Sequence, residues 1–195
     1  MISVAIIDYG AGNVRSVEYA LRRIGVRTMT SSDPAVLRTA DKLILPGVGE
    51  ARSAMERLTS VGLLSWLRTT TQPFLGICLG MQLLFDRSTE RSTDCLGVLP
   101  GTIELFPSGK VPHLGWNTVE HDGVDPLWQD IPSGSFFYFV HSYCAPRGPF
   151  TLGTTEYGVP FSSAVRMENR RGVQFHPEKS GTAGLQLLKN FIERC

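Results

Sequence analysis

The sequence has little of what marks several specialised classes of protein. Its four cysteines, Cys78, Cys95, Cys144 and Cys195, form no CxxC pair and have no metal-like spacing to the four histidines. Neither a disulfide framework nor a metal site is therefore indicated. No apolar run has the length of a membrane span, and the first residues show neither a basic leader nor a cleavage signal. We expect a cytoplasmic protein that does not contact a membrane.

An excess of charge of either sign is also lacking. The 19 lysines and arginines nearly balance the 18 acidic residues, and they are scattered along the chain. A surface that binds nucleic acid is therefore not expected. With 195 residues, of which 42% are hydrophobic, the chain can bury one sizeable core. We predict a single domain that spans residues 1–195.

The fingerprint of a dinucleotide cofactor is incomplete. GlyAlaGly at 10–12 follows the first expected strand, but Arg15 occupies the position of the third glycine, and no acidic residue clearly ends the second strand. No nicotinamide or flavin cofactor is expected. The histidines at 113, 121 and 141 have no ligand-like spacing, so we interpret them as structural.

Strand-like and helix-like segments alternate through the first 80 residues. The expected strands are 2–9, 26–30, 43–45 and 74–78, and the expected helices are 16–24, 50–58 and 63–68, with a short helix after Pro34. Strands that are separated by helices pair in parallel, with helices on both faces of the sheet. The sequence therefore predicts a doubly wound α/β sheet that binds its ligand at the carboxyl ends of the strands.

The second half of the chain changes character. Segments 102–106, 136–143 and 161–165 are strand-like and rich in aromatic residues, with glycine and proline between them. We interpret them as an antiparallel extension of the same domain. A turn at 169–172, a strand at 173–175 and a final helix at 182–194 complete the prediction.

The most informative stretch is PFLGICLGMQLLF, residues 73–85. An apolar run stops at Cys78, which lies between Gly76 and Gly80, and a helical pattern that includes Leu83 and Leu84 follows at once. A nucleophile elbow needs small residues on both sides, because bulky ones would collide with the strand and the helix. Unpaired N–H groups at the start of a helix favour a thiolate. Cys78 is thus a candidate nucleophile, and a buried structural cysteine is the alternative.

A candidate acid and its partner lie far along the chain. His176 and Glu178 follow a short apolar segment, where side chains project into the ligand crevice. A thiolate nucleophile needs a general acid to protonate the leaving group, and an imidazole needs a carboxylate to fix its tautomer. The pattern His-x-Glu is more often structural, and the elbow upstream is what favours catalysis.

Candidate oxyanion donors flank the elbow. PGVG at 46–49 ends the neighbouring strand with two glycines. Two backbone N–H groups that point to one place form an oxyanion hole. Leu79 would give one donor, and Val48 or Gly49 the other. A plain turn between strand and helix is the alternative.

Together these motifs resemble a known family. GICLGMQ at 76–82, PGVG at 46–49 and HPEKS at 176–180 are similar to the motifs of the class I, or triad, glutamine amidotransferases. Four further motifs resemble one branch of that family, the glutaminase subunits of imidazole glycerol phosphate synthases in histidine biosynthesis. They are IDYGAGN at 7–13, PHLGWN at 112–117, YFVHSY at 138–143 and GTTEYG at 153–158. The motifs cover nearly the whole chain. The resemblance implies a flavodoxin-like mixed sheet with an antiparallel extension.

The resemblance also implies a reaction. Cys78 would attack the side-chain amide of L-glutamine, His176 would protonate the departing ammonia, and Glu178 would orient His176. Water would then cleave the thioester to glutamate. By the same resemblance, Gln82, Ser142 and Tyr143 would hold the amino-acid end of glutamine.

A partner is implied as well. Ammonia escapes into water, so a glutaminase should work only when it is docked to its acceptor enzyme. The family's partner is a (β/α)8 cyclase, with which the glutaminase forms a heterodimer. The resemblance assigns Asn13, Trp116, Asn117, Tyr138 and Lys179 to the docking face. The glycines at 47 and 49 suggest that the oxyanion loop flips a peptide only when the partner binds.

Three alternatives stay open. The chain could serve another pathway, such as anthranilate or aminodeoxychorismate synthesis, although segments 112–117 and 138–143 argue against it. A cysteine hydrolase or peptidase could use the same elbow. A binding module without catalysis could keep the fold.

Overall fold

The computed structural model describes residues 2–195. Its helices are α1 (Val14–Arg23), α2 (Pro34–Leu37), α3 (Ala51–Ser60), α4 (Leu64–Thr69), α5 (Leu79–Gln82) and α6 (Gly181–Arg194), with single 3-10 turns η1 (Glu90–Ser92), η2 (Pro126–Trp128) and η3 (Pro177–Lys179). Its strands are β1 (Val4–Ile7), β2 (Thr28–Ser31), β3 (Lys42–Gly47), β4 (Phe74–Cys78), β5 (Phe85–Ser88), β6 (Thr93–Asp94), β7 (Leu99–Leu105), β8 (His113–Val119), β9 (Ser135–His141), β10 (Tyr143–Cys144), β11 (Thr151–Tyr157), β12 (Val159–Met167) and β13 (Arg170–Val173). Among the described residues, no helix has the length and apolar character needed to cross a membrane.

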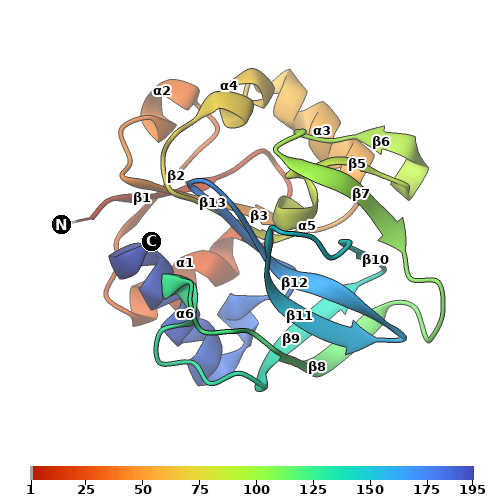
Figure 1. The fold of residues 1–195 in the computed structure, drawn as a ribbon. Coiled ribbons are helices and arrows are strands. Elements are labelled where there is room, and N and C mark those ends of the chain that lie inside the picture. The colour runs from red at the N-terminus through yellow and green to blue at the C-terminus, as the bar shows by residue number, and fades with distance from the viewer. Residues whose placement is uncertain (1) are drawn as a thin grey trace.

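A seven-stranded mixed sheet runs through the centre of the molecule (Figure 1). Its order is β11-β12-β13-β4-β3-β1-β2, and the five strands from β2 to β13 are parallel. Their order, with β13 counted as the fifth strand, is that of a flavodoxin-like sheet. Strands β12 and β11 continue the sheet in antiparallel pairing. The predicted doubly wound sheet with an antiparallel extension is confirmed.

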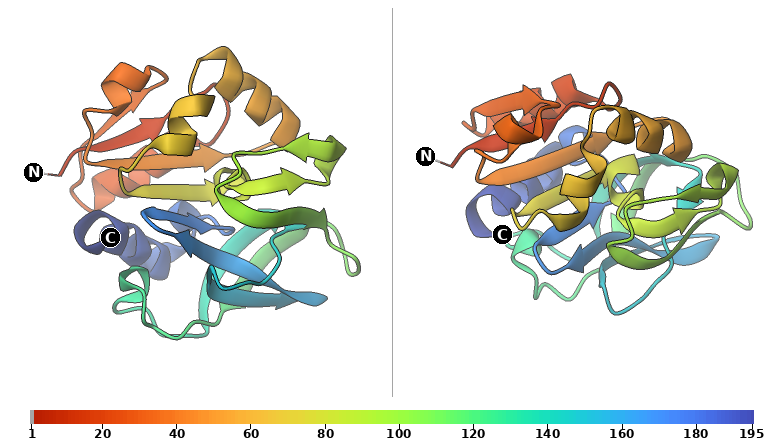
Figure 2. Two further views of the ribbon diagram at one scale, coloured as in Figure 1. Left: turned by 45° about the horizontal axis from the view of Figure 1, so that its top comes forward. Right: turned by 90° about the horizontal axis from the view of Figure 1, so that it is seen from above.

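Helices cover both faces of this sheet. Along β1, Val4 and Ile6 pack in a cluster with α1 and α6, whereas Ala5 and Ile7 pack in a cluster with α3 and α4. Figures 1 and 2 show α3 and α4 on one side and α1 and α6 on the other. A strand buried on both faces reads as a continuous apolar run, which is why the sequence pattern of β1 was informative.

Two smaller sheets lie beside the central one. Strands β8 and β9 form an antiparallel hairpin, and β10, β7, β5 and β6 form a four-stranded sheet. Figure 2 shows both at the end of the molecule toward which the arrows of β3 and β4 point. Parallel sheets bind ligands at that end, so the small sheets wall the site.

The predicted turn at 169–172 is wrong. Residues 168 and 169 make the turn, and Arg170–Val173 is strand β13, parallel to β4. Strand β13 is buried but contains two arginines, so its sequence does not show the apolar pattern of a buried strand. Both arginines bond to distant groups: Arg170 Nη2 donates to the backbone oxygens of Arg68 and Thr70, and Arg171 pairs with Asp125 at 2.9 Å.

The helix after Cys78 is shorter than predicted. It ends at Gln82, and the chain enters β5, a strand that the sequence pattern missed. Leu83 and Leu84 lie at helical spacing, but the Leu84 carbonyl accepts hydrogen bonds from Val98 and Leu99 instead. One helical turn carries little macrodipole, so any stabilisation of a thiolate comes from the local N–H groups.

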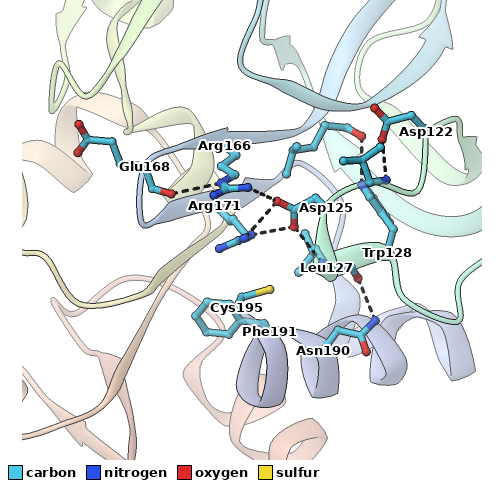
Figure 3. Close-up of polar contacts among 12 residues, drawn as sticks. Asp122, Asp125, Leu127, Trp128, Arg166, Glu168, Arg171, Asn190, Phe191 and Cys195 are labelled. Carbon is cyan, nitrogen blue, oxygen red and sulfur yellow. Dashed lines mark hydrogen bonds and ion pairs between the residues drawn. The ribbon is translucent and has the colours of Figure 1, made fainter.

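A buried carboxylate ties a long loop to the sheet. Figure 3 shows Asp125 between Arg166 of β12 and Arg171 of β13, with ion pairs of 3.0 and 2.9 Å. The Asn190 side chain of α6 donates to the Leu127 carbonyl in the same loop. The arginines hold the pKa of Asp125 below its usual value against the opposing effect of burial. These contacts fix β13 at the start of the segment that carries His176.

Candidate active site

Cys78 occupies a strained turn between β4 and α5. Its φ of 56° and ψ of −111° lie outside the regions that residues with a side chain normally adopt. The residue is buried to 7% exposure. The Sγ atom lies 3.8 Å from the Val140 carbonyl and 3.7 Å from Nε2 of Gln174. Such strain persists only where the surrounding structure enforces it, and it clusters at active sites.

Three glycines allow the elbow to form. A Cβ added to Gly80 would lie 1.9 Å from the Leu45 carbonyl oxygen, and one added to Gly76 would lie 2.5 Å from the Gly80 oxygen. A Cβ on Gly47 would lie 2.5 Å from the Gly80 nitrogen. The backbone of α5 therefore packs directly on β3 and β4, as the sequence motif predicted, and pushes Cys78 outward.

His176 and Cys78 line the same pocket at the carboxyl end of the sheet, and Glu178 pairs with His176. Strand β13 pairs with β4 so that Val173 lies opposite Ile77, and the chain then carries His176 to the wall of the pocket that Cys78 lines. Glu178 Oε1 lies 2.8 Å from Nδ1 of His176, and both side chains are buried. Burial lowers the pKa of His176, but Cys78 and Glu178 outweigh burial and raise it to about 10. A thiol, an imidazole and a carboxylate in series can perform nucleophilic catalysis.

The backbone of His176 is fixed from a second direction. Its N–H donates to the Tyr138 carbonyl of β9 at 2.9 Å, and its carbonyl accepts from the Ser180 hydroxyl at 2.6 Å. The same hydroxyl accepts from the Tyr138 N–H at 2.9 Å. The β8–β9 hairpin therefore fixes the backbone that carries the imidazole.

The pocket beside Cys78 has a volume of about 400 Å³, large enough for a small amino acid. Among the predicted site residues, it is lined by Cys78, His176, Val48, Gly49, Leu79, Gln82, Ser142 and Tyr143. Gly49 adopts a φ of 97°, and no atom lies within 4 Å of the position that a Cβ would take.

Gln82 faces the pocket and is already engaged. Its Nε2 donates to the Tyr143 carbonyl at 3.0 Å and to Gln174 Oε1 at 2.9 Å. Gln174 in turn donates to the Cys78 sulfur. The buried amides of Gln82 and Gln174 therefore link the back of the pocket to the nucleophile candidate.

Comparison with known proteins decides the family. Residues 5–195 match the family described as glutamine amidotransferase class-I. The chain belongs to the class I glutamine amidotransferases. This amidotransferase is 46% identical to the imidazole glycerol phosphate synthase subunit HisH of Vibrio parahaemolyticus, over 97% of each chain. It is 47% identical to the subunit HisH of Bacteroides fragilis, over 98% of this chain and 100% of that one.

Solved structures agree on the fold. A crystal structure of a glutamine amidotransferase aligns with a TM-score of 0.77 at 22% identity, over 97% of each chain. A chain of the PurLQS structure from Thermotoga maritima aligns with a TM-score of 0.73 at 20% identity, again over 97% of each chain. At sequence identities this low, the structural similarity supports the fold and not a shared function.

The amidotransferase places three of the five predicted docking residues together. Trp116 of β8 is 55% exposed and lies edge-on to Tyr138 of β9 at 6.0 Å. Lys179 of η3 lies over the same tyrosine ring at 5.8 Å. Asn13 caps α1, which packs against η3. Asn117 instead points to β11, where its Nδ2 donates to the Glu156 carbonyl at 3.0 Å.

Several residues of the site were not predicted from the sequence: Glu90, Pro112, Val140 and His141 line the pocket, and Gln174 donates to the Cys78 sulfur. Gln174 lies two positions before His176, just beyond the end of β13. Alternate residues of the strand predicted at 173–175 would share one face, so this spacing could have suggested Gln174. Glu90 also lines the pocket, and its Oε2 accepts from the Ala51 N–H at 2.8 Å. Nothing in the local sequence marks Glu90, because η1 reaches the pocket only through the pairing of β5 with β7.

Proposed function

We propose that this chain is the glutaminase subunit of an imidazole glycerol phosphate synthase. It would hydrolyse L-glutamine to glutamate and ammonia and pass the ammonia to a (β/α)8 cyclase subunit, which makes imidazole glycerol phosphate and aminoimidazole carboxamide ribotide. The pocket that joins Cys78 to His176 carries the proposal. The chain is 46–47% identical to subunits named HisH over nearly their full length. This similarity supports histidine biosynthesis over the anthranilate and aminodeoxychorismate alternatives.

The first chemical step is attack by sulfur. In the resting site, the raised pKa of His176 favours an imidazolium, which can act as the general acid. Glu178 accepts a hydrogen bond from the Nδ1–H of His176, which leaves the Nε2–H of the ring for transfer to the leaving group. The thiolate attacks the Cδ carbon of glutamine, His176 gives its Nε2 proton to the departing ammonia, and a thioester remains. Water, deprotonated by His176, then releases glutamate and the thiolate.

The negatively charged oxygen of each tetrahedral intermediate is stabilised by hydrogen-bond donors. We assign one to the Leu79 N–H, next to the nucleophile, and the other to the N–H of Val48 or Gly49. Removal of one such donor typically slows catalysis by roughly two to three orders of magnitude. The open surroundings and left-handed backbone of Gly49 support a loop that can reorient a peptide.

Glutamine would bind with its side chain toward Cys78. Gln82, Ser142 and Tyr143 would hold its amino-acid end, as the family motif suggests. Glu90 lies on the same wall, and its negative charge suits the substrate's ammonium group. Glu90 and Glu50 also contribute, after burial, to a raised pKa of Tyr143, which indicates an acidic wall.

The outer face of the β8–β9 hairpin would dock the cyclase. Leu114, Trp116 and Phe136 are exposed large apolar side chains on this face, and Tyr138 lies between them. Aromatic anchors of this kind often dominate the energy of an interface. We further propose that residues 1–195 act as one domain in the cytoplasm, where thiols stay reduced, because all four cysteines are free.

Glutamine hydrolysis by the complex tests the proposal. The purified chain is mixed with the cyclase and assayed for glutamate and ammonia, beside Cys78→Ala. We expect turnover by the wild type and a loss of at least about a thousandfold in the variant, since truncation of a catalytic nucleophile commonly costs that much or more. Hydrolysis of peptides but not of glutamine would point to the peptidase alternative instead.

Partner dependence tests the oxyanion loop. If the loop completes the site only on docking, glutamine turnover should rise when the cyclase is added. Equal turnover with and without the cyclase would refute this part of the proposal and leave the triad untouched.

A further inference from the structure

Two buried histidines that the reaction does not use form a pair behind the pocket. His113 of β8 lies opposite His141 of β9 in the antiparallel register. Nδ1 of His113 is 2.9 Å from Nε2 of His141. The His113 ring is stacked against Tyr157 at 4.0 Å and Phe139 at 4.8 Å. The pair is therefore held rigidly, and His141 also lines the pocket.

The hydrogen bonds allow one arrangement of protons. Nδ1 of His141 lies 2.8 Å from the Tyr143 carbonyl oxygen, which can only accept, so this nitrogen carries a proton. Nε2 of a neutral His141 must then accept from Nδ1 of His113. Nε2 of His113 is left to accept from Asn117 Nδ2 at 3.3 Å.

The orientation of the Asn117 amide agrees with this order. Its Nδ2 also donates to the Glu156 carbonyl, and its Oδ1 accepts from the Thr118 N–H at 2.8 Å. Every ring nitrogen is thus satisfied while both histidines are neutral. A proton added to His141 would set two N–H groups against each other across 2.9 Å, and one added to His113 would oppose the Asn117 amide at 3.3 Å.

The surroundings keep the pair neutral. Burial lowers the pKa of His113 to about 4. Burial, with His113 and His176 nearby, lowers the pKa of His141 to about 3. Phe106 and Phe161 pack against both rings. An uncharged pair with fixed tautomers is the state that this apolar box stabilises.

The chain of hydrogen bonds continues to the nucleophile candidate. The Tyr143 carbonyl accepts from His141 and also from Gln82 Nε2. Gln82 bonds to Gln174, and Gln174 bonds to the Cys78 sulfur. The complete path runs through Asn117, His113, His141, Tyr143, Gln82, Gln174 and Cys78. It begins one residue from the exposed Trp116.

We propose that His113 and His141 are positioning residues that couple the β8–β9 hairpin to the glutamine pocket. As a neutral pair they hold the Tyr143 carbonyl and the Gln82 amide in place, and docking of the cyclase on the outer face of the hairpin tightens this path. The inference rests on the proposed function. This coupling differs from the direct hydrogen bond between Tyr138 and His176. That bond fixes the backbone of His176 but does not reach Tyr143 and Gln82, which line the pocket.

Three substitutions separate this role from folding. His113→Phe keeps the aromatic stack but removes both hydrogen bonds, whereas His113→Asn keeps a donor near the position of Nδ1. His121→Phe is the matched control: His121 stacks on Trp128 at 4.3 Å and lies outside the path. Each variant is assayed for glutamine hydrolysis in complex with the cyclase, after its fold is checked by thermal unfolding.

The expected pattern is specific. His113→Phe lowers kcat/KM for glutamine by about tenfold, mainly through KM, because a buried acceptor on His141 loses its partner. His113→Asn loses about threefold or less, and His121→Phe matches the wild type. A folded His113→Phe variant with wild-type kinetics would overturn the coupling. A wild-type complex that hydrolyses no glutamine would instead refute the proposed function.

Nitrogen NMR of the wild-type chain decides the tautomers without any assay. Both His113 and His141 should carry their proton on Nδ1 and should not titrate between about pH 5 and 8. This readout holds even if His113→Phe fails to fold. A proton on Nε2 of His141, or titration of either ring in that range, would overturn the proposal.

Discussion

Cys78 and His176 show how single residues depend on neighbours that are distant in sequence. The glycines on either side of Cys78 predicted its strained backbone, because their role is steric and local. Gln174 and Glu90 carry no such local mark, since tertiary pairing brings them to the pocket. Sequence patterns could therefore predict the candidate nucleophile and its imidazole but not the amides and the carboxylate that surround them.

The raised pKa of His176 predicts a pH-dependent stability. The folded value of about 10 lies above the ordinary value of 6.5, so the contribution is complete below pH 6.5 and is lost as pH rises toward 10. Within that window the loss follows about 1.4 kcal/mol per pH unit. Glu178→Gln removes one cause of the raised pKa and should be less stable than the wild type at low pH.

Urea unfolding across this window measures the effect. The gap in unfolding free energy between wild type and Glu178→Gln should close between pH 6.5 and about pH 10. A gap that stays constant over this range would contradict the assigned role of Glu178 in raising the pKa of His176.

At the scale of elements, β3, β4 and α5 cross with their backbones in close contact. Gly80→Ala would place a methyl group 1.9 Å from a backbone oxygen of β3, which cannot give way. We expect a loss of more than about 3 kcal/mol in unfolding free energy, or failure to fold. Gly25→Ala is the control, because Gly25 has a φ of 78° but open space around it.

The control isolates strain from collision. Left-handed backbone costs a residue with a side chain about 1–2 kcal/mol, so Gly25→Ala should unfold at a modestly lower temperature. If thermal unfolding showed equal losses for both variants, steric contact would not be what the elbow glycines prevent.

Elements were predictable where their pattern is local. Strands β1, β3 and β4 contain apolar runs, and helices α1 and α6 follow apolar periodicity. Strand β5 was missed, because Leu84 has helical spacing. The last parallel strand was predicted at 173–175 instead of Arg170–Val173, because its arginines carry charge. In both cases distant partners, the 96–99 segment and Asp125, supply the hydrogen bonds that decide the structure.

At the scale of the whole molecule, the proposed function depends on the surface that docks the cyclase. The outer face of the β8–β9 hairpin is apolar and joined to His176 through Tyr138. Trp116→Ala should weaken binding of the cyclase by about thirtyfold, as expected for an aromatic anchor worth about 2 kcal/mol. Tyr19→Ala is the control, since Tyr19 is 63% exposed on α1.

Titration of each variant with the cyclase, followed by calorimetry, gives the affinities. Tyr19→Ala should bind like the wild type. Equal affinity of Trp116→Ala and the wild type would show that the cyclase docks elsewhere on the molecule.

The most direct measurement of the central claim is covalent labelling by an electrophilic analogue of glutamine, such as its diazoketone, in complex with the cyclase. Mass spectrometry of the digested chain should find the adduct on Cys78 alone among the four free cysteines, and glutamine should protect it. An adduct on Cys95 or Cys144, or a Cys78 that stays unmodified while glutamine is being consumed, would contradict the account.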